Sequence, residues 1–126
     1  MQKDFTNKSM KDLINLFKLE LEAQSRLNSN DYQNAIKIYN EIYIKRIQLK
    51  NFIGAIKALC IITKTYFELG NELNWKIWHK KLIDELEQYS LNSNFKKDFY
   101  KNLIDFYEKK QRFDIIEELN KKFESV

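Results

Sequence analysis

Apolar residues recur at spacings of three and four along nearly the whole chain, a pattern typical of amphipathic helices. No stretch shows the sustained apolar–polar alternation of a half-buried strand. Short polar segments interrupt the pattern at 28–31, 50–51, 70–71, 90–94 and 111–112. We therefore predict an all-α protein with six helices, over about residues 13–27, 32–47, 52–69, 73–89, 95–110 and 113–123.

Two of these interruptions differ in how strongly they predict a turn. Gly70 stands where a left-handed helix cap favours glycine, and Asn71 after it can cap the next helix. We therefore expect a positive φ angle at Gly70. The interruption at Lys50 and Asn51 contains neither glycine nor proline, so only the change in pattern predicts a boundary there.

The polar interruptions also reveal an internal repeat. Three of them are followed by an apolar residue and, two or three positions later, by a second one. The equivalent positions recur every 40 or 41 residues, a period typical of stacked helical hairpins that cannot bury their apolar stripes alone. The paired positions are Tyr32 with Ala35, Leu73 with Trp75, and Phe113 with Ile116.

The first of these hairpins resembles the tetratricopeptide-repeat family. The segment 30–39 is similar to that family's hinge and second helix, with Ala35 as the small residue near the start. Tyr66 and Tyr107 are similar to the residue near the end of the first helix of a unit. The sequence departs from the family in having no proline and in units about six residues longer than the common 34-residue one.

This resemblance implies three stacked antiparallel helical hairpins, which form a short right-handed α-solenoid in one domain over residues 1–126. Residues 1–8 are expected to be a flexible tail. In this family, the first helix of each unit contributes side chains to a concave groove that binds a partner. The corresponding positions are Phe17, Glu20 and Gln24, then Lys57, Cys60 and Lys64, then Asp98, Lys101 and Asp105 with Asn102 beside them.

The polar members of this set define the partner-binding residues that we predict. The spacing i, i+3, i+7 places each trio on one helical face. Residues 33–81 carry nine basic and three acidic side chains, against a net charge of +4 for the whole chain. This surplus is either a solvated face or a patch for an acidic partner. The predicted contacts are Gln24, Lys57, Lys64, Lys101, Asn102 and Asp105.

Composition narrows the class of function. The 126 residues include two glycines, no proline, one cysteine and one histidine. These numbers exclude glycine-rich phosphate loops, internal disulfide frameworks and cysteine-rich zinc modules. The N-terminus carries charges where a secretory signal needs an apolar run, and no apolar stretch is long enough to span a bilayer. We therefore expect a cytoplasmic protein without a membrane partner.

Candidate catalytic residues are few. His79 lies between tryptophans and leucine, where a histidine is more often partly buried than catalytic. Cys60 lies on an apolar helix, which is typical of a buried and inert thiol. A zinc site that joins His79 to Asp84 and Glu85 lacks ligands and a shared helical face. We predict no catalytic residue, no metal and no cofactor, and therefore no enzyme.

These observations favour a non-catalytic protein–protein interaction module, such as an adaptor, scaffold, assembly or regulatory subunit, that binds a peptide or helix in its groove. The alternative is an RNA- or ribonucleoprotein-binding helical-repeat protein that uses the basic region 33–81. A third class, an enzyme or enzyme-regulating domain, has no motif in its favour. Salt separates the first two classes, because phosphate contacts weaken steeply as salt is added.

Overall fold

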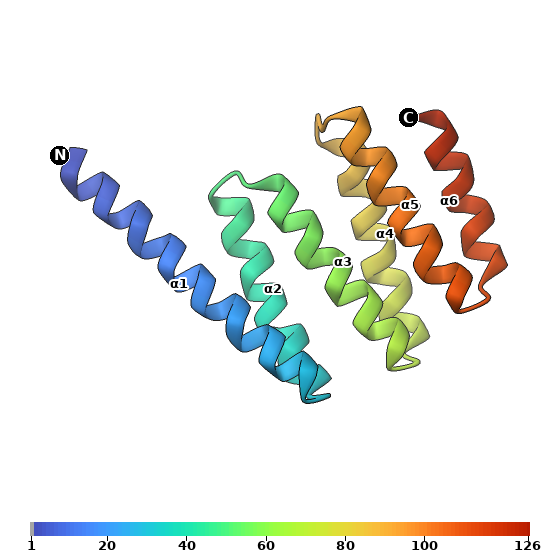
Figure 1. Ribbon diagram of the computed structural model, residues 1–126, viewed down its shortest axis with the longest axis horizontal. Helices are drawn as coiled ribbons and strands as arrows, with labels where there is room; N and C mark the ends of the chain where they lie inside the picture. The colour runs from blue at the N-terminus through green and yellow to red at the C-terminus, as the bar shows by residue number, and fades with distance from the viewer. Residues whose placement is uncertain (1) are drawn as a thin grey trace. The chain divides into compact units, whose positions relative to one another are not determined.

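The protein consists of six α-helices joined by short turns, as the computed structural model shows (Figure 1). The structure describes the backbone of residues 2–126 and the side chains of residues 10–126, so the tail expected over residues 1–8 lies outside the described side chains. No strand occurs in the described chain, and the prediction of an all-α protein with six helices is confirmed. The helices are α1 (Gln2–Asn28), α2 (Tyr32–Gln48), α3 (Phe52–Glu68), α4 (Glu72–Gln88), α5 (Ser93–Lys109) and α6 (Phe113–Ser125).

Four of the five turns share one backbone conformation. Each has three residues, and the middle one lies in the left-handed region. The N–H groups of the middle and last residues donate to carbonyl oxygens three and five residues earlier, which closes the helix in a Schellman motif. The middle residues are Asn30 (φ 60°), Lys50 (φ 58°), Gly70 (φ 70°) and Gln111 (φ 58°).

These angles confirm the positive φ expected at Gly70 and also the boundary near Lys50. Without a glycine, the second turn is held by hydrogen bonds on both sides of Lys50. The Lys50 N–H donates to the Ile47 carbonyl at 3.0 Å, and the Asn51 side chain accepts from the Gly54 N–H at 3.0 Å. A cap of the next helix therefore helps to fix the conformation that Lys50 adopts.

The repeated turn explains the period in the sequence. Helices α2 to α5 each have 17 residues, and most are followed by three turn residues, so a hairpin occupies about 40 positions. The second helices of the three hairpins begin at Tyr32, Glu72 and Phe113. The alignment of Leu73 with Tyr32 is therefore wrong by one residue, and Leu73 is 73% exposed. The fourth positions, which the sequence aligned correctly, are all buried: Ala35, Trp75 and Ile116.

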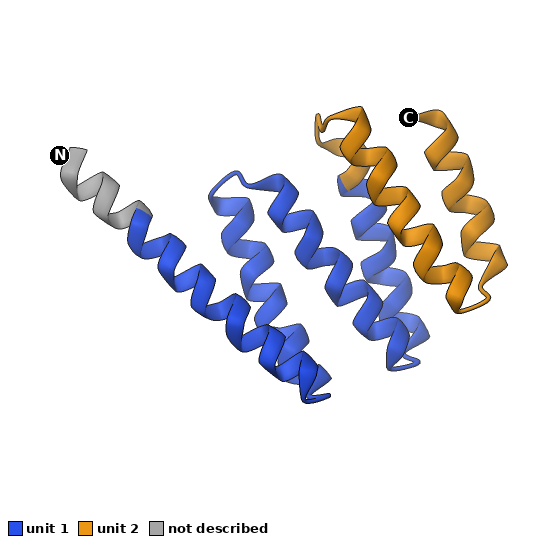
Figure 2. Ribbon diagram, in the orientation of Figure 1, with its two compact units in different colours: residues 1–85 blue, residues 86–126 orange. Residues whose placement is uncertain are grey.

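The chain divides into two compact units, residues 1–85 and residues 86–126, which Figure 2 shows in different colours. The boundary lies inside α4, so no linker separates the units. In unit 1, α2 packs against both α1 and α3, and in unit 2, α5 packs against α6. A single domain over residues 1–126 stays a prediction.

Each unit has its own apolar core. In unit 1, Ala23, Ala35 and Ala55 are fully buried, one on each of α1, α2 and α3, and these small side chains let neighbouring helices approach closely. Larger side chains fill the space around them. The largest fully buried ones in unit 1 are Leu16, Ile42, Ile56, Leu59, Ile62 and Leu82, and those in unit 2 are Tyr100, Tyr107, Leu86, Leu103 and Leu119.

Several apolar residues that the helical pattern placed in the core are instead exposed. Helix α1 buries only a narrow face against α2, because Leu16 and Ala23 lie on one line along the helix. Apolar side chains on other faces of α1 stay at the surface, and they include Leu13 and Phe17. Ile77 on α4 and Phe113 on α6 are exposed as well.

Candidate partner-binding groove

The site begins at the close approach of α2 and α3, where Gly54 lies beside Arg46. A Cβ atom at Gly54 would lie 2.7 Å from Cδ of Arg46 and 2.8 Å from Nδ2 of Asn51. Because Gly54 has no side chain, the Arg46 side chain can extend past it. At its end, the Arg46 guanidinium forms an ion pair with the Glu20 carboxylate of α1. This pair joins the first two helices beside the start of the third.

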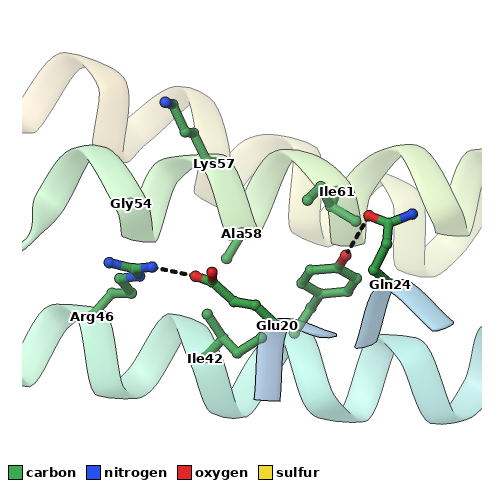
Figure 3. Close-up of a pocket in the computed structure, with 9 residues that line it drawn as sticks. Glu20, Gln24, Ile42, Arg46, Gly54, Lys57, Ala58 and Ile61 are labelled. Carbon is green, nitrogen blue, oxygen red and sulfur yellow. Dashed lines mark hydrogen bonds and ion pairs between the residues drawn. The ribbon is translucent and has the colours of Figure 1, made fainter. Parts of the chain in front are cut away.

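The ion pair borders a hollow of about 250 Å³ in unit 1 (Figure 3). Toward the other side of the hollow, the Tyr39 hydroxyl donates to Oε1 of Gln24 at 3.5 Å. Lys57 lies on the rim and points away from the ion pair. We call this space the first hollow, and it is lined by Glu20, Gln24, Tyr39, Ile42, Arg46, Gly54, Lys57, Ala58 and Ile61.

The side chains that line the first hollow carry one net positive charge. Arg46 and Glu20 neutralise each other, and among the described residues no carboxylate pairs with Lys57. Burial raises the pKa of Tyr39 above the usual value of a tyrosine, and the nearby Glu20 carboxylate raises it further. Tyr39 therefore stays a neutral hydrogen-bonding group at physiological pH. The hollow presents polar groups and one ammonium to a ligand.

A second hollow, of about 290 Å³, lies further along α3. Ile61 lines both hollows, so they are neighbours along that helix. Thr65 contributes its methyl group more readily than its hydroxyl, because the hydroxyl donates to the Ile61 carbonyl at 2.7 Å. The lining is mainly apolar and consists of Leu27, Tyr32, Ile61, Lys64, Thr65 and Glu68. We call the two hollows together the α1–α3 groove.

The groove contains three of the six residues predicted to contact a partner. Gln24 and Lys57 line the first hollow, and Lys64 lines the second. Glu20, which the resemblance also placed in a groove, lines the first hollow through its ion pair with Arg46. Cys60, the middle member of the second trio, is buried and lines neither hollow. Its burial raises the pKa of the thiol, as expected of an inert cysteine.

The other three predicted residues lie in unit 2. Lys101, Asn102 and Asp105 are exposed on α5, as is Asp98 one turn before them. Their helix is amphipathic, and its opposite face buries Tyr100, Leu103, Ile104 and Tyr107. Unit 2 therefore presents a polar face on α5, made of both signs of charge.

Phe17 of the first trio belongs to a different surface feature. It is 61% exposed and lies in a row of apolar side chains on α1 at spacings of three and four residues. All members of the row are more than half exposed. We call this row the α1 stripe, and it consists of Met10, Leu13, Ile14, Phe17 and Leu21.

Sequence reasoning missed three parts of the groove: Arg46, Tyr39 and Gly54. The sequence pattern included Tyr39 only in the segment 30–39 that resembles a repeat, and Arg46 only in the basic region 33–81. The signal that pointed to them was Gly54, because a glycine within the first turn of a helix has no capping role. Close approach of another side chain is the remaining reason for such a glycine.

Residues considered for chemistry are placed as follows. His79 is 8% exposed, and its ring stacks on Trp75 with centroids 4.9 Å apart. Of the two carboxylates considered with it, Asp84 is exposed and Glu85 is half-buried on α4. Among the described residues, no group of three His, Cys, Asp or Glu side chains is arranged to hold a metal ion. None of the helices described has both the length and the apolar character needed to cross a bilayer.

No protein-family model, curated protein or solved structure matches the chain. The relationship to tetratricopeptide repeats therefore stays an expectation from the sequence, and the functional proposal rests on the geometry of the groove.

Proposed function

We propose that this protein is a non-catalytic protein–protein interaction module, a tetratricopeptide-like adaptor, scaffold, assembly or regulatory subunit. It binds a peptide or a helix of another protein in the α1–α3 groove. The observation that carries this proposal is the pair of neighbouring hollows along α3. Each is at or below the lower end of the volumes usual for small-molecule pockets, about 300 Å³. Two such hollows in a row fit successive side chains of a longer ligand.

The lysines of the groove favour acidic groups on that ligand. Lys57 and Lys64 are seven residues apart on α3, so they stand about 10 Å apart along the helix. One lines each hollow. The Glu68 carboxylate also lines the second hollow, so Lys57 is the stronger candidate for contact with an acidic group of the partner. We also infer a cytoplasmic location, because the only cysteine is a buried thiol and cannot form an internal disulfide.

RNA or ribonucleoprotein binding is the second candidate function, because residues 33–81 carry a surplus of basic side chains. The groove supports it less well. Bases bind to proteins by stacking on exposed aromatic rings, whereas Tyr39 is buried and only the half-buried Tyr32 lines the second hollow.

Site-specific photo-cross-linking in the native cell tests the proposal. A photoreactive residue replaces Lys57 on the rim of the groove, and the matched control carries it at Lys76, an exposed lysine of α4. We expect a cross-linked species at Lys57 only, sensitive to protease and resistant to nuclease. A nuclease-sensitive product establishes RNA binding instead. Equal cross-linking at both positions, or none at Lys57, rejects the groove as the site.

A double charge reversal, Lys57→Glu with Lys64→Glu, tests the role of the lysines. Both side chains lie at the surface of the groove, so the helical circular dichroism should not change. Capture of the cross-linked partner should weaken, mainly through slower and more salt-sensitive association. Unchanged capture by the folded double variant places the interface outside the α1–α3 groove.

A further inference from the structure

The α1 stripe has the geometry of a helix-docking face. Its members stand at positions 10, 13, 14, 17 and 21, the spacing by which two packed helices interlock their side chains. All five are more than half exposed, and together they present on the order of 500 Å² of apolar surface. Contiguous apolar patches of this size on soluble proteins usually mark binding surfaces.

The stripe is continuous with the α1–α3 groove. Phe17 lies one turn before Glu20, and Leu21 lies one turn before Ser25 and beside Gln24 on the helix surface. Glu20 and Gln24 line the first hollow. A helix laid along α1 therefore contacts the stripe with its apolar face and reaches the hollow with the side chains at its edge. From Met10 to Leu21 the stripe is about 17 Å long, which is the length of three helical turns.

Net positive charge borders the apolar surface on both sides. Lys11 and Lys18 are exposed on α1, beyond the stripe as seen from the groove, together with one exposed acid, Glu22. Lys57 lies across the first hollow on α3. The carboxylate of Glu20, between them, is neutralised by Arg46. An occupant with acidic residues on both flanks of an apolar face is complementary to this pattern.

Resting on the proposed function, we propose that the partner is an amphipathic helix of at least three turns with acidic flanks, docked along the α1 stripe and into the first hollow. A second copy of α1 fits less well. Antiparallel pairing of two stripes brings the same flank of the two copies together, and on that flank Lys11 and Lys18 outnumber Glu22. An anionic membrane surface also fits less well, because a flat bilayer leaves the hollow empty.

Synthetic helical peptides test this proposal with the full-length protein. The probe peptide has an apolar leucine face flanked by glutamates, and its matched control has lysines at the same flank positions. Fluorescence anisotropy should show at least tenfold tighter binding of the acidic peptide, with a preference that decreases as salt is added. Equal or tighter binding of the basic peptide overturns the proposal.

Variants locate the binding surface. Phe17→Ser with Leu21→Ser should weaken the acidic peptide at least tenfold, and Lys11→Glu with Lys18→Glu should reduce the preference for acidic flanks. The matched control is Ile77→Ser, which removes a side chain of similar exposure, 57%, from α4 and should leave binding unchanged. Loss of binding in the control, or none in the stripe variant, overturns the assignment to α1.

Two further measurements address the other occupants. Light scattering at increasing protein concentration should show a monomer. A dimer that Phe17→Ser abolishes would mean that a second copy of the chain occupies the stripe. Vesicles containing phosphatidylserine should not displace the acidic peptide. Displacement would mean that a membrane surface occupies the stripe. A protein cross-linked at Lys57 together with no binding of the acidic peptide refutes only this inference, whereas an RNA cross-link there refutes the proposed function as well.

Discussion

The two units share their construction and differ in the surfaces that they expose. In both, a helical hairpin is closed by a turn with one left-handed residue, at Asn30, Lys50 and Gly70 in unit 1 and at Gln111 in unit 2. Unit 1 exposes the apolar α1 stripe and the α1–α3 groove beside it. Unit 2 exposes mainly polar side chains on α5, and Phe113 is its one exposed large apolar side chain among the described residues.

This difference separates the positions that determine the fold from those that select a partner. The turn and the buried fourth residue of each second helix occur in both units, so they serve the fold. The stripe, the Arg46–Glu20 pair and the two hollows lie in unit 1, so a contact that depends on apolar area belongs there. The charged face of α5 is suited to contacts that raise the rate of association with a partner more than the binding affinity.

The largest expected effect concerns the fourth helical position, which is small in α2 of unit 1 and large in α6 of unit 2. Ala35 is fully buried, whereas Ile116 at the equivalent place is 8% exposed. Ala35→Leu should lower the free energy of unfolding by about 1–3 kcal/mol, because the added atoms overpack a filled core. Urea denaturation followed by circular dichroism measures this change. Lys37→Leu at an exposed position of α2 is the control and should have little effect. A tolerated Ala35→Leu shows that α1 and α2 can separate at this point.

The next effect compares the turns. Gly70→Val should lower the free energy of unfolding by about 1–2 kcal/mol, because a residue with a Cβ is strained in the left-handed region. No atom lies within 4 Å of the position of the added Cβ, so the backbone alone is responsible. Gln111 in unit 2 also has a positive φ, 58° against 70° at Gly70, so Gln111→Gly removes strain and should not lower stability. If Gly70→Val proved neutral in a urea titration, the left-handed turn would not limit stability here.

Much of the fold was predictable from the sequence because it depends on local patterns. The apolar spacing predicted six helices, and the polar interruption at Lys50 located a turn without any glycine. Core membership was harder to predict. Phe17 and Ala23 both fit the helical period of α1, but only Ala23 is buried, because a helix packed against one neighbour buries a narrow face. The number of neighbours is a tertiary property that a single helix does not encode.

Gly54 gives the third prediction, which tests a feature found only in unit 1. Gly54→Ala should displace Arg46 and separate it from Glu20, since the new Cβ needs the space of the Arg46 side chain. Glu20→Gln should cost up to about 1 kcal/mol in the wild-type protein, as half-exposed ion pairs do, and nothing in the Gly54→Ala background. The four unfolding free energies form a double-mutant cycle. An equal cost in both backgrounds means that Arg46 reaches Glu20 by another path.

The Arg46–Glu20 pair helps to explain why only three of the six predicted partner-binding residues line the α1–α3 groove. The resemblance placed groove residues by their position within a repeat, and that rule brought Gln24 and Lys57 to the same hollow. It gave no role to Arg46, which enters from the second helix of a hairpin. The long side chain crosses between helices only because Gly54 has none, and such a pairing of residues eight positions apart is invisible to a repeat alignment.

The smallest expected effect compares one tyrosine of each unit at alkaline pH. Burial raises the pKa of Tyr100 to about 12, with a further contribution from the Glu87 carboxylate, and Tyr39 is raised by burial and Glu20. Because the pKa of Tyr100 is higher in the folded state, the stability linked to it is complete below pH 10 and decreases as the pH rises toward 12. Tyr39 and Tyr100 should therefore ionise above the usual pH range of a tyrosine in a titration followed by tyrosinate absorbance.

Matched variants assign the two steps. Tyr100→Phe should remove the step near pH 12 and reduce the loss of unfolding free energy between pH 10 and 12, because the group that must be forced to ionise is gone. Glu20→Gln should lower the pKa of Tyr39 and leave that of Tyr100 unchanged, since the removed charge belongs to unit 1. If Glu20→Gln left the Tyr39 step in place, burial alone would raise that pKa.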